Sequence, residues 1–285
     1  MATNCSTEQP RPFERNTHVP VPLHTTGKAS FDDIYHRPDP RDYYTRLADL
    51  DYRIPELAKT HFAQQILECR AATGGETLTV LDIGCSYGIN AALLRLDTSM
   101  GELAEYYGDA VEFDRAALAA RDRARLATAD KLPGIRFLGM DAARPALAYA
   151  HAAGLLHDTV HADLETSEPT EEQRRILASA DLVISTGCIG YVTEKTLARI
   201  ASAGSRRPPW MAHFVLRMFD FAPIAAHLST LGYRTERVPG MFEQRRFASP
   251  GERSQVLDLL TAKGIDTAGY EAQGWLYANL YLSRP

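Results

Sequence analysis

The stretch that decides the fold runs Val80-Leu-Asp-Ile-Gly-Cys-Ser-Tyr-Gly-Ile-Asn90. It begins inside LTVLDIG, a short apolar run after a Gly-Gly break, and this composition is typical of a buried strand. The residues that follow, NAALLRL, have the composition of a helix. Gly84 and Gly88 lie between the two segments and allow the backbone to turn tightly and to pass close to a ligand. The stretch therefore predicts a strand, a tight loop and a helix whose first amides face a polar ligand.

Outside this stretch, three further apolar runs have the same strand-like character. They are IRFLGMD from Ile135, TVHADL from Thr159 and DLVIST from Asp181. Helix-forming segments such as RPALAYAHAAGLL and TEEQRRILASA lie between runs, and the tail adds WMAHFVLRM, YRTERVPGMFEQRRF and WLYANLYLSRP. Strands that alternate with helices predict βαβ units and a parallel sheet with helices on both faces.

Changes in composition along the chain predict its organisation. Residues 1–30 are polar and contain several prolines, so we expect a flexible leader. Residues 31–73 have aromatic and aliphatic side chains at helical spacing and predict an N-terminal helical cap. Residues 74–285 form the main domain, in which a helical insertion at about 97–133 is expected to lie beside the ligand cleft.

The overall composition limits the class of partner. The chain has 285 residues, of which 45% are hydrophobic, and this is enough to bury a substantial core. Its formal net charge of −5 provides no basic footprint for a phosphate backbone, so we expect no nucleic-acid partner. The four cysteines are scattered, which is typical of reduced thiols in a cytoplasmic protein. No apolar run reaches membrane-spanning length, so no membrane partner is expected.

The order of residues in the glycine loop points to a family. Asp82-x-Gly84-x-x-x-Gly88 differs from the GxGxxG order of dinucleotide-binding enzymes. It resembles motif I of the class I S-adenosylmethionine-dependent methyltransferases, whose loop faces the amino-acid end of S-adenosylmethionine. The resemblance implies that Asp82, Gly84, Cys85, Ser86 and Gly88 bind this cofactor. The alternative is a plain strand–helix turn whose glycines serve only steric needs.

Two later motifs follow in the order that the family has. FLGMD-Ala142 resembles its second strand, so Asp141 and Ala142 are expected at the ribose, whose hydroxyl protons a carboxylate can accept. Glu112, in AVEFDRAAL, competes for this role but has no convincing strand before it. HADLE resembles the adenine loop, in which Asp163 would accept from the exocyclic amine with Leu164 beside the ring.

The fourth motif and the tyrosines before the sheet complete the expected cofactor site. In DLVISTGCIGY, the resemblance implies cofactor contacts from Ser185, Thr186 and Gly187. Aromatic faces attract a sulfonium cation, so Tyr35 and Tyr44, with their neighbours Tyr43 and Tyr52, are candidates for a lid over the cofactor. For each of these tyrosines, the alternative is that it pins the N-terminal helices to the domain.

Methyl transfer requires an aligned acceptor in a dry pocket, and a general base only where the nucleophile must lose a proton. Tyr191 is a candidate for the acceptor pocket or for the core. His213, His36 and Glu243 are candidate bases, each with a structural alternative, and FEQRRF predicts an outward-facing charged strand around Glu243. We expect no metal, because no cysteine joins the only histidines at helical spacing.

The resemblance covers about Leu78 to Pro285. It implies a Rossmann-like α/β sandwich with a seven-stranded, mostly parallel sheet, helices on both faces and an N-terminal helical lid. It also implies methyl transfer from S-adenosylmethionine to a small-molecule acceptor in natural-product biosynthesis. The chain further resembles bacterial enzymes that methylate indole C3 of tryptophan-containing cyclodipeptides, and a homodimer is compatible with the sequence.

Two alternative functions stay open at this point. Some relatives close S-adenosylmethionine on itself to azetidine-2-carboxylate and release methylthioadenosine. A non-catalytic cofactor-binding protein would have the same motifs without consuming an acceptor.

Overall fold

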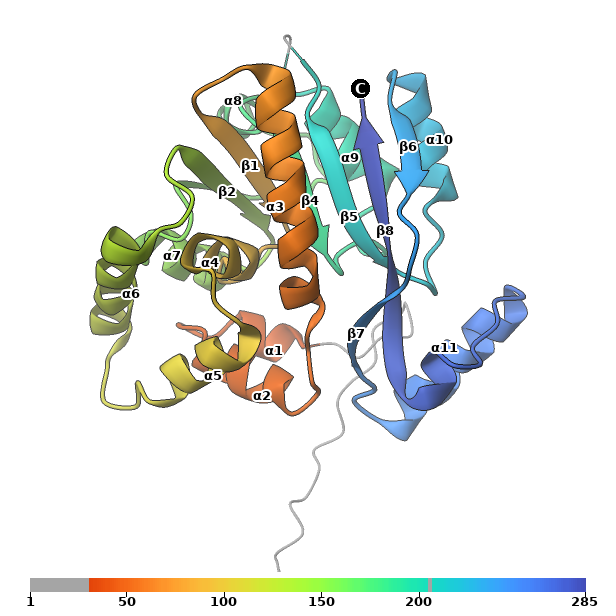
Figure 1. The fold of residues 1–285 in the computed structure, drawn as a ribbon, viewed down its shortest axis with the longest axis horizontal. Helices are drawn as coiled ribbons and strands as arrows, with labels where there is room; N and C mark the ends of the chain where they lie inside the picture. The colour runs from red at the N-terminus through yellow and green to blue at the C-terminus, as the bar shows by residue number, and fades with distance from the viewer. Residues whose placement is uncertain (1–30, 205–206) are drawn as a thin grey trace, which may run out of the picture.

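The computed structural model describes residues 31–204 and 207–285, and the leader expected at 1–30 lies outside the described residues. Strands and helices alternate along the chain, as the apolar runs predict (Figure 1). The strands are β1 (Leu78–Ile83), β2 (Ile135–Asp141), β3 (Asp158–His161), β4 (Leu182–Thr186), β5 (Trp210–Leu216), β6 (Arg234–Arg237), β7 (Phe242–Arg246) and β8 (Trp275–Arg284).

The helices include three that precede the sheet in the chain and two in the expected insertion. They are α1 (Asp32–Tyr35), α2 (Arg41–Ala48), α3 (Ile54–Thr73), α4 (Ile89–Leu96), α5 (Met100–Gly108), α6 (Arg115–Ala129), α7 (Arg144–Ala152), α8 (Glu171–Leu177), α9 (Glu194–Ala201), α10 (Ala222–Thr230), α11 (Pro250–Ala262) and the short 3-10 helix η1 (Glu271–Gln273).

The order of the strands determines where a ligand crevice is expected. Seven strands lie side by side in the order β3-β2-β1-β4-β5-β8-β6, and β7 pairs with the other half of β8. Strands β1 to β5 are parallel, and β8 runs antiparallel to its three partners. The predicted α/β sandwich with a mostly parallel sheet is confirmed. Because the chain moves outward in both directions from β1 and β4, a crevice is expected at their carboxyl ends.

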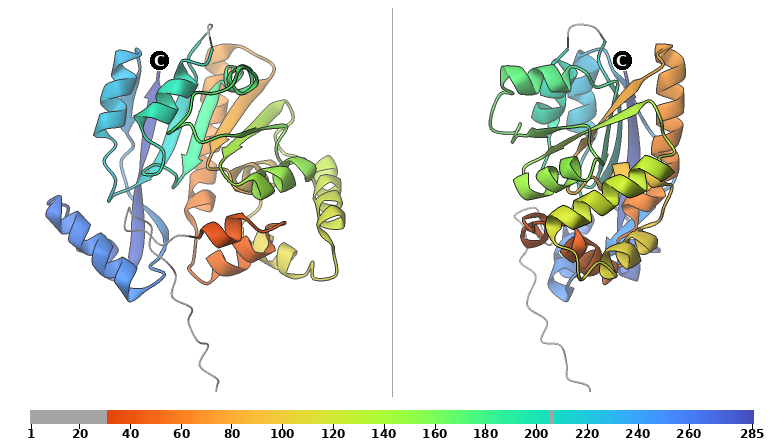
Figure 2. Two further views of the ribbon diagram at one scale, coloured as in Figure 1. Left: turned by 180° about the vertical axis from the view of Figure 1, so that it is seen from behind. Right: turned by 90° about the vertical axis from the view of Figure 1, so that its left-hand side faces the viewer.

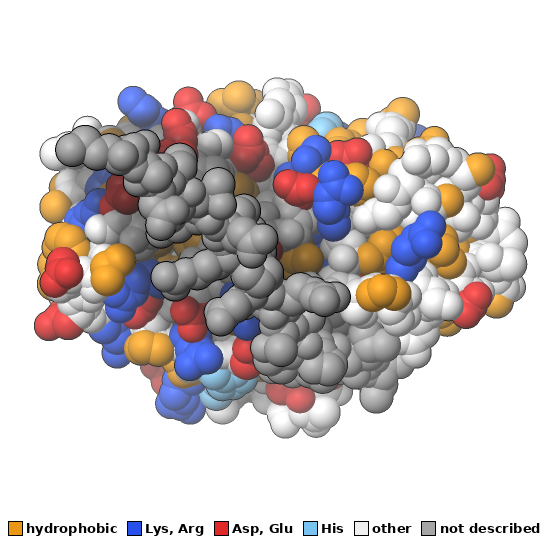
Figure 3. Space-filling view, turned by 90° about the horizontal axis from the view of Figure 1, so that it is seen from below, with side chains coloured by type: hydrophobic (Ala, Val, Ile, Leu, Met, Phe, Trp, Pro, Cys, Tyr) orange, Lys and Arg blue, Asp and Glu red, His pale blue; other side chains and the backbone are white. Residues whose placement is uncertain are grey.

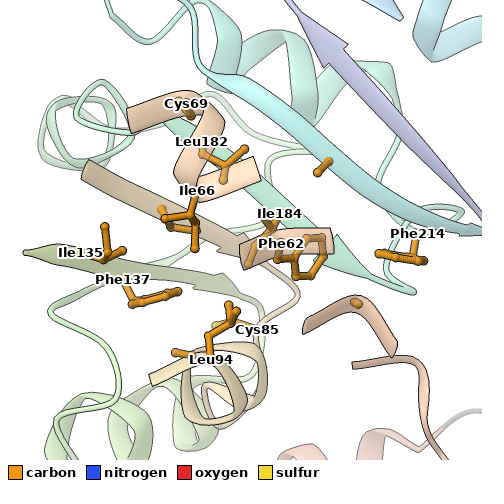
Figure 4. Packing of buried hydrophobic residues seen from close by; sticks show 14 of the residues in the cluster. Phe62, Ile66, Cys69, Cys85, Leu94, Ile135, Phe137, Leu182, Ile184 and Phe214 are labelled. Atoms are coloured by element: carbon orange, nitrogen blue, oxygen red, sulfur yellow. The ribbon is translucent and has the colours of Figure 1, made fainter. Parts of the chain in front are cut away.

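Helices cover both faces of the sheet, which explains why β1 is buried along its whole length (Figure 2). On one face, Phe62 and Ile66 of α3 pack with Phe137 and Ile184 of the sheet (Figure 4). On the other face, side chains of α8, α9 and α10 pack on the alternate positions of the same strands. Within residues 31–73, the long helix α3 therefore belongs to the sandwich itself.

Helices α1 and α2 lie beyond the edge of the sheet toward which β4 points (Figure 1). Tyr87, in the glycine loop, holds α1 there, because its single hydroxyl hydrogen is shared between the carbonyl oxygens of Ile34 at 2.7 Å and Arg37 at 2.9 Å. The apolar side chains of α1 and α2 share a core with α4, α5, α6 and α7. The expected insertion thus supports the same edge of the sheet as the two cap helices.

One expectation about this region is wrong. Arg245 was predicted on an outward-facing charged strand, but its side chain is 1% exposed and pairs with the buried Glu252 of α11 at 2.6 Å. The register of β7 against β8 shifts between Glu243 and Arg245, so the regular alternation of facing is interrupted there. The guanidinium also lies 5.2 Å from the ring centre of Phe31, next to α1.

We predict that Glu252→Ala destabilises the protein by about 3–5 kcal/mol, because it leaves the Arg245 charge buried without its partner. Asp42→Ala is the matched control, since its 3.0 Å pair with Arg37 is exposed and contributes about 1 kcal/mol or less. Urea unfolding of the two variants measures the difference. Equal, small losses would contradict the role of the buried pair.

Candidate cofactor site

The carboxylate of Asp82 lies one residue before the end of β1 and is completely buried. Both of its oxygens accept from Nδ2 of Asn90, at 3.0 and 3.1 Å. Burial raises the pKa of Asp82 to about 8, the Asn90 hydrogen bonds oppose this rise, and the nearby carboxylate of Asp141 adds to it. Asp82 is therefore an acid that is largely neutral at pH 7, and no lysine or arginine among the described residues pairs with it.

The loop after Asp82 takes the tight path that its glycines predict. Gly84 and Gly88 have φ angles of 66° and 77°, in the left-handed region. A Cβ on Gly84 would lie 2.7 Å from Cβ of Cys188, so the loop following β4 packs directly on this turn. Ser86 adopts φ 51° without being glycine, a conformation that is found preferentially at functional sites.

The predicted ribose residue, Asp141, lies beside this loop at the end of β2. One of its oxygens accepts from the backbone N–H of Ser86 and the other from that of Ala143, both at 2.8 Å. Each oxygen keeps a lone pair for a further donor. Its competitor, Glu112, is exposed in the turn between α5 and α6 and ends no strand.

The other predicted loop residues lie at the same edge of the sheet. Asp163 is exposed, and its carboxylate accepts hydrogen bonds from the N–H of Glu165 and the hydroxyl of Thr166 in the same loop. Leu164, by contrast, is buried. Nε2 of His161 lies 3.0 Å from the carbonyl oxygen of Ala142, which connects this loop to the end of β2.

At the end of β4, alternation of side chains separates two predicted neighbours. Thr186 faces the Asp82 side of the sheet, where its Oγ1 accepts from Asn90 at 3.2 Å. Ser185 faces the other side and hydrogen bonds Nδ1 of His213 at 2.8 Å. Gly187 continues the loop, and its N–H donates to the carbonyl of Phe214. The structure thus brings Thr186, but not the Ser185 side chain, to Asp82.

Tyrosines from the cap gather over the two carboxylates. The ring centre of Tyr43 lies 6.1 Å from that of Tyr35 and 6.5 Å from that of Tyr52. Burial raises the pKa of all three hydroxyls, with a further contribution from Asp141 at Tyr35 and from Asp82 at Tyr43 and Tyr52. The Tyr52 hydroxyl also donates to the carbonyl of Thr186 at 3.4 Å.

The other predicted lid residue, Tyr44, has a different environment. Its ring stacks on that of Tyr107 of α5, with centres 4.8 Å apart and planes 12° apart. It also lines a cavity of about 220 Å³ between α2 and α5, together with Tyr52 and Met100. Tyr44 therefore links the cap to the insertion, whereas Tyr35, Tyr43 and Tyr52 lie nearest the carboxylates.

The four candidate catalytic residues lie in different environments. Tyr191 lies close enough to Tyr35 for its hydroxyl to raise that group's pKa. His213 is completely buried on the other face, and burial lowers its pKa to about 3, so it is a poor proton acceptor at neutral pH. Glu243 pairs with Arg53 at 2.7 Å, and His36 is exposed on the loop after α1.

Asn90 is a site residue that the sequence reasoning missed. It closes the quoted stretch, and its place in the first turn of α4 directs the side chain back to the end of β1. The signal available in the sequence was a polar residue in the first turn of α4, where its neighbours Ile89, Ala91 and Ala92 are apolar and buried.

The described residues contain neither a metal-binding cluster nor a membrane-spanning helix. Among them, no cluster of three or more His, Cys, Asp or Glu side chains has a geometry that holds a metal ion. Likewise, no described helix is both long and apolar enough to cross a bilayer. On the face of the molecule that includes the cap, basic and acidic side chains are interspersed over the described surface (Figure 3).

No protein-family model matches the chain, and no curated protein sequence matches it. Similar solved structures include the magnesium protoporphyrin IX methyltransferase of Synechocystis, with 15% identity and a TM-score of 0.38 over 80% of this chain and 81% of that one. A SAM-dependent methyltransferase of Aquifex aeolicus has 12% identity and a TM-score of 0.39 over 90% and 100%. One of Corynebacterium glutamicum has 16% identity and a TM-score of 0.36 over 79% and 98%. The activity of this chain is therefore inferred from its own site.

We predict that Asp82 makes the protein less stable as the pH rises from about 4 to about 8. In this window the unfolded chain has lost the Asp82 proton while the folded chain still holds it, so the free energy of unfolding falls with pH. Asp82→Asn removes this contribution, and its stability relative to the wild type should grow across the window and level off above pH 8. Urea unfolding at several pH values measures the difference, with the exposed Asp163→Asn as control. A difference that does not change with pH would contradict the raised pKa.

Proposed function

We propose that this chain binds S-adenosylmethionine at the carboxyl ends of β1, β2 and β4 and transfers its methyl group to a small-molecule acceptor. The observation that carries the proposal is the pair of carboxylates, Asp82 and Asp141, at the ends of adjacent parallel strands. Within residues 31–204 and 207–285, neither forms an ion pair with lysine or arginine. A buried carboxylate without a partner is costly, and a cationic ligand removes that cost.

The residues at this edge fit the chemical groups of S-adenosylmethionine. Asp82 offers a carboxylate to the ammonium group of the amino-acid end. Asp141 keeps lone pairs for the two ribose hydroxyls after accepting from the loop amides. The rings of Tyr35, Tyr43 and Tyr52 provide faces that attract a cation and keep water out. When bound, the cofactor supplies an electrophilic methyl group on a positively charged sulfur.

The predicted bases bear on the kind of acceptor. His213 is held by Ser185 beneath the sheet surface, and Glu243 is held by Arg53. An acceptor atom that already has available electrons needs no base before it attacks. This favours neutral amines or electron-rich carbon, and it is compatible with the indole C3 of a cyclodipeptide in natural-product biosynthesis. Tyr191, next to Tyr35, is the residue that we propose to contact this acceptor.

A second candidate function is favoured by the raised pKa of Asp82. Cyclisation to azetidine-2-carboxylate requires loss of a proton from the amino group, whose nitrogen then attacks the γ-carbon as methylthioadenosine leaves. Once ionised, a carboxylate with a pKa of about 8 is a stronger base than an ordinary aspartate, so it can take this proton as the pH approaches 8. The same residue therefore supports either reaction, and the products distinguish them.

We predict that the purified protein makes S-adenosylhomocysteine from S-adenosylmethionine only when an acceptor is present. Incubation with a panel of cyclodipeptides and small amines, followed by mass spectrometry, identifies the product and the methylated acceptor. Methylthioadenosine formed at enzymatic rate without an acceptor would replace methyl transfer by cyclisation. Tight cofactor binding with no consumption across the panel would indicate a non-catalytic binding protein.

We also predict that Asp82→Ala and Asp141→Ala each weaken S-adenosylmethionine binding by about 10- to 100-fold. Each variant removes a hydrogen-bond acceptor from a charged or polar group of the ligand, which costs on the order of 1–3 kcal/mol. Isothermal titration calorimetry measures the affinities, with the exposed Asp258→Ala on α11 as a matched control. Unchanged affinity in both folded variants would show that the ligand binds elsewhere.

A further inference from the structure

We infer that Asn90 has two roles toward the amino-acid end of the ligand, an inference that rests on the proposed function. Its side-chain oxygen is an acceptor for the ligand's ammonium group, and its side-chain nitrogen positions the Asp82 carboxylate for the same group. Asn90 would thus be both a ligand-binding and a positioning residue.

The orientation of the Asn90 side chain is determined by its neighbours. The residue is 4% exposed. Its Nδ2 has three acceptors within reach, namely both oxygens of Asp82 at 3.0 and 3.1 Å and Oγ1 of Thr186 at 3.2 Å. Because an amide nitrogen has only two hydrogens, these acceptors occupy its whole donor capacity. The amide oxygen is therefore directed away from the Asp82 carboxylate.

The environment of the Asn90 side-chain oxygen points to a ligand. Oδ1 of Asn90 is buried and has no hydrogen-bond partner among the residues that the structure describes. Buried amide oxygens in folded proteins are almost always hydrogen-bonded, and one without a partner at a candidate site calls for an explanation. A purely structural bridge between β1 and β4 would need only the nitrogen, so the free oxygen indicates a donor that arrives with the ligand.

The chemistry of the ligand matches this arrangement. An ammonium group carries three N–H donors, so it can use a carboxylate oxygen of Asp82 and the amide oxygen of Asn90 together. Nδ2 holds the carboxylate in place, and the contact with Thr186 extends to the cap, because the carbonyl of Thr186 accepts from Tyr52. Asn90 therefore connects the ammonium site to the tyrosines above it.

Asn90→Ala tests the inference when two ligands are compared by calorimetry. S-adenosylmethionine carries the ammonium group, whereas methylthioadenosine has the same nucleoside and sulfur without the amino-acid end. We expect the variant to bind S-adenosylmethionine at least about 10-fold more weakly and methylthioadenosine within about 2-fold of the wild type. Gln65→Ala, which removes a buried amide bonded to Glu68 and Arg284, is the matched control and should change neither affinity.

The pH dependence of binding gives a readout that a merely structural role would not change. In the wild type, affinity for S-adenosylmethionine should rise as the pH approaches about 8, because Asp82 must ionise to pair with the ammonium group. Above that pH the affinity should fall again, because a free α-amino group loses its proton at about pH 8. The Asn90 hydrogen bonds lower the pKa of Asp82, so in Asn90→Ala this rise should move to higher pH. Asn90→Ser serves the same test if the alanine variant does not fold.

The outcomes separate the two proposals. An unchanged affinity for S-adenosylmethionine in the folded variant, or an equal loss for both ligands with an unshifted pH profile, would overturn the role of Asn90. Failure of the wild type to bind either ligand would overturn the proposed function itself, and this inference with it.

Discussion

A carboxylate buried at the end of a central strand is the constraint on which the rest of the site depends. Asp82 lies where helices cover both faces of the sheet, so water cannot stabilise its charge. The Asn90 amide offsets only part of that cost, and the remaining imbalance keeps the group largely neutral until a cation pairs with it. The preference for a positively charged ligand is therefore a consequence of the fold as well as of the residue.

The cap helices and the insertion cover the edge of the sheet at which Asp82 lies. Tyr87 fastens α1 to the glycine loop, and the stacked pair of Tyr44 and Tyr107 joins α2 to the insertion. Behind that pair, the carboxylate of Asp122 accepts from Tyr107 at 2.8 Å and from Tyr149 of α7 at 2.7 Å. Two segments far apart in the sequence thus brace each other over the same strand ends, which favours a dry site.

Short sequence patterns predicted the features that residues close together in the chain determine. The alternation of apolar runs and helices predicted the α/β sheet. The order of acid and glycines predicted Asp82 at the end of one strand, and the resemblance of FLGMD to the family's second strand predicted Asp141 at the end of the next. Long-range contacts were not predictable in this way. The bulge in β7 directs Arg245 into the core toward Glu252. The role of Asn90 depends on the fold in the same way, because the fold brings Thr186 of β4 within hydrogen-bonding distance of its side chain. Both depend on partners that pattern reasoning does not identify.

A crystal structure of the complex with S-adenosylhomocysteine tests the central claim most directly. We expect the ligand's amino group to lie at Asp82 and Asn90, and its ribose hydroxyls to lie at Asp141 beneath the tyrosines of the cap. A ligand bound elsewhere, with Asp82 still facing only Asn90, would contradict it.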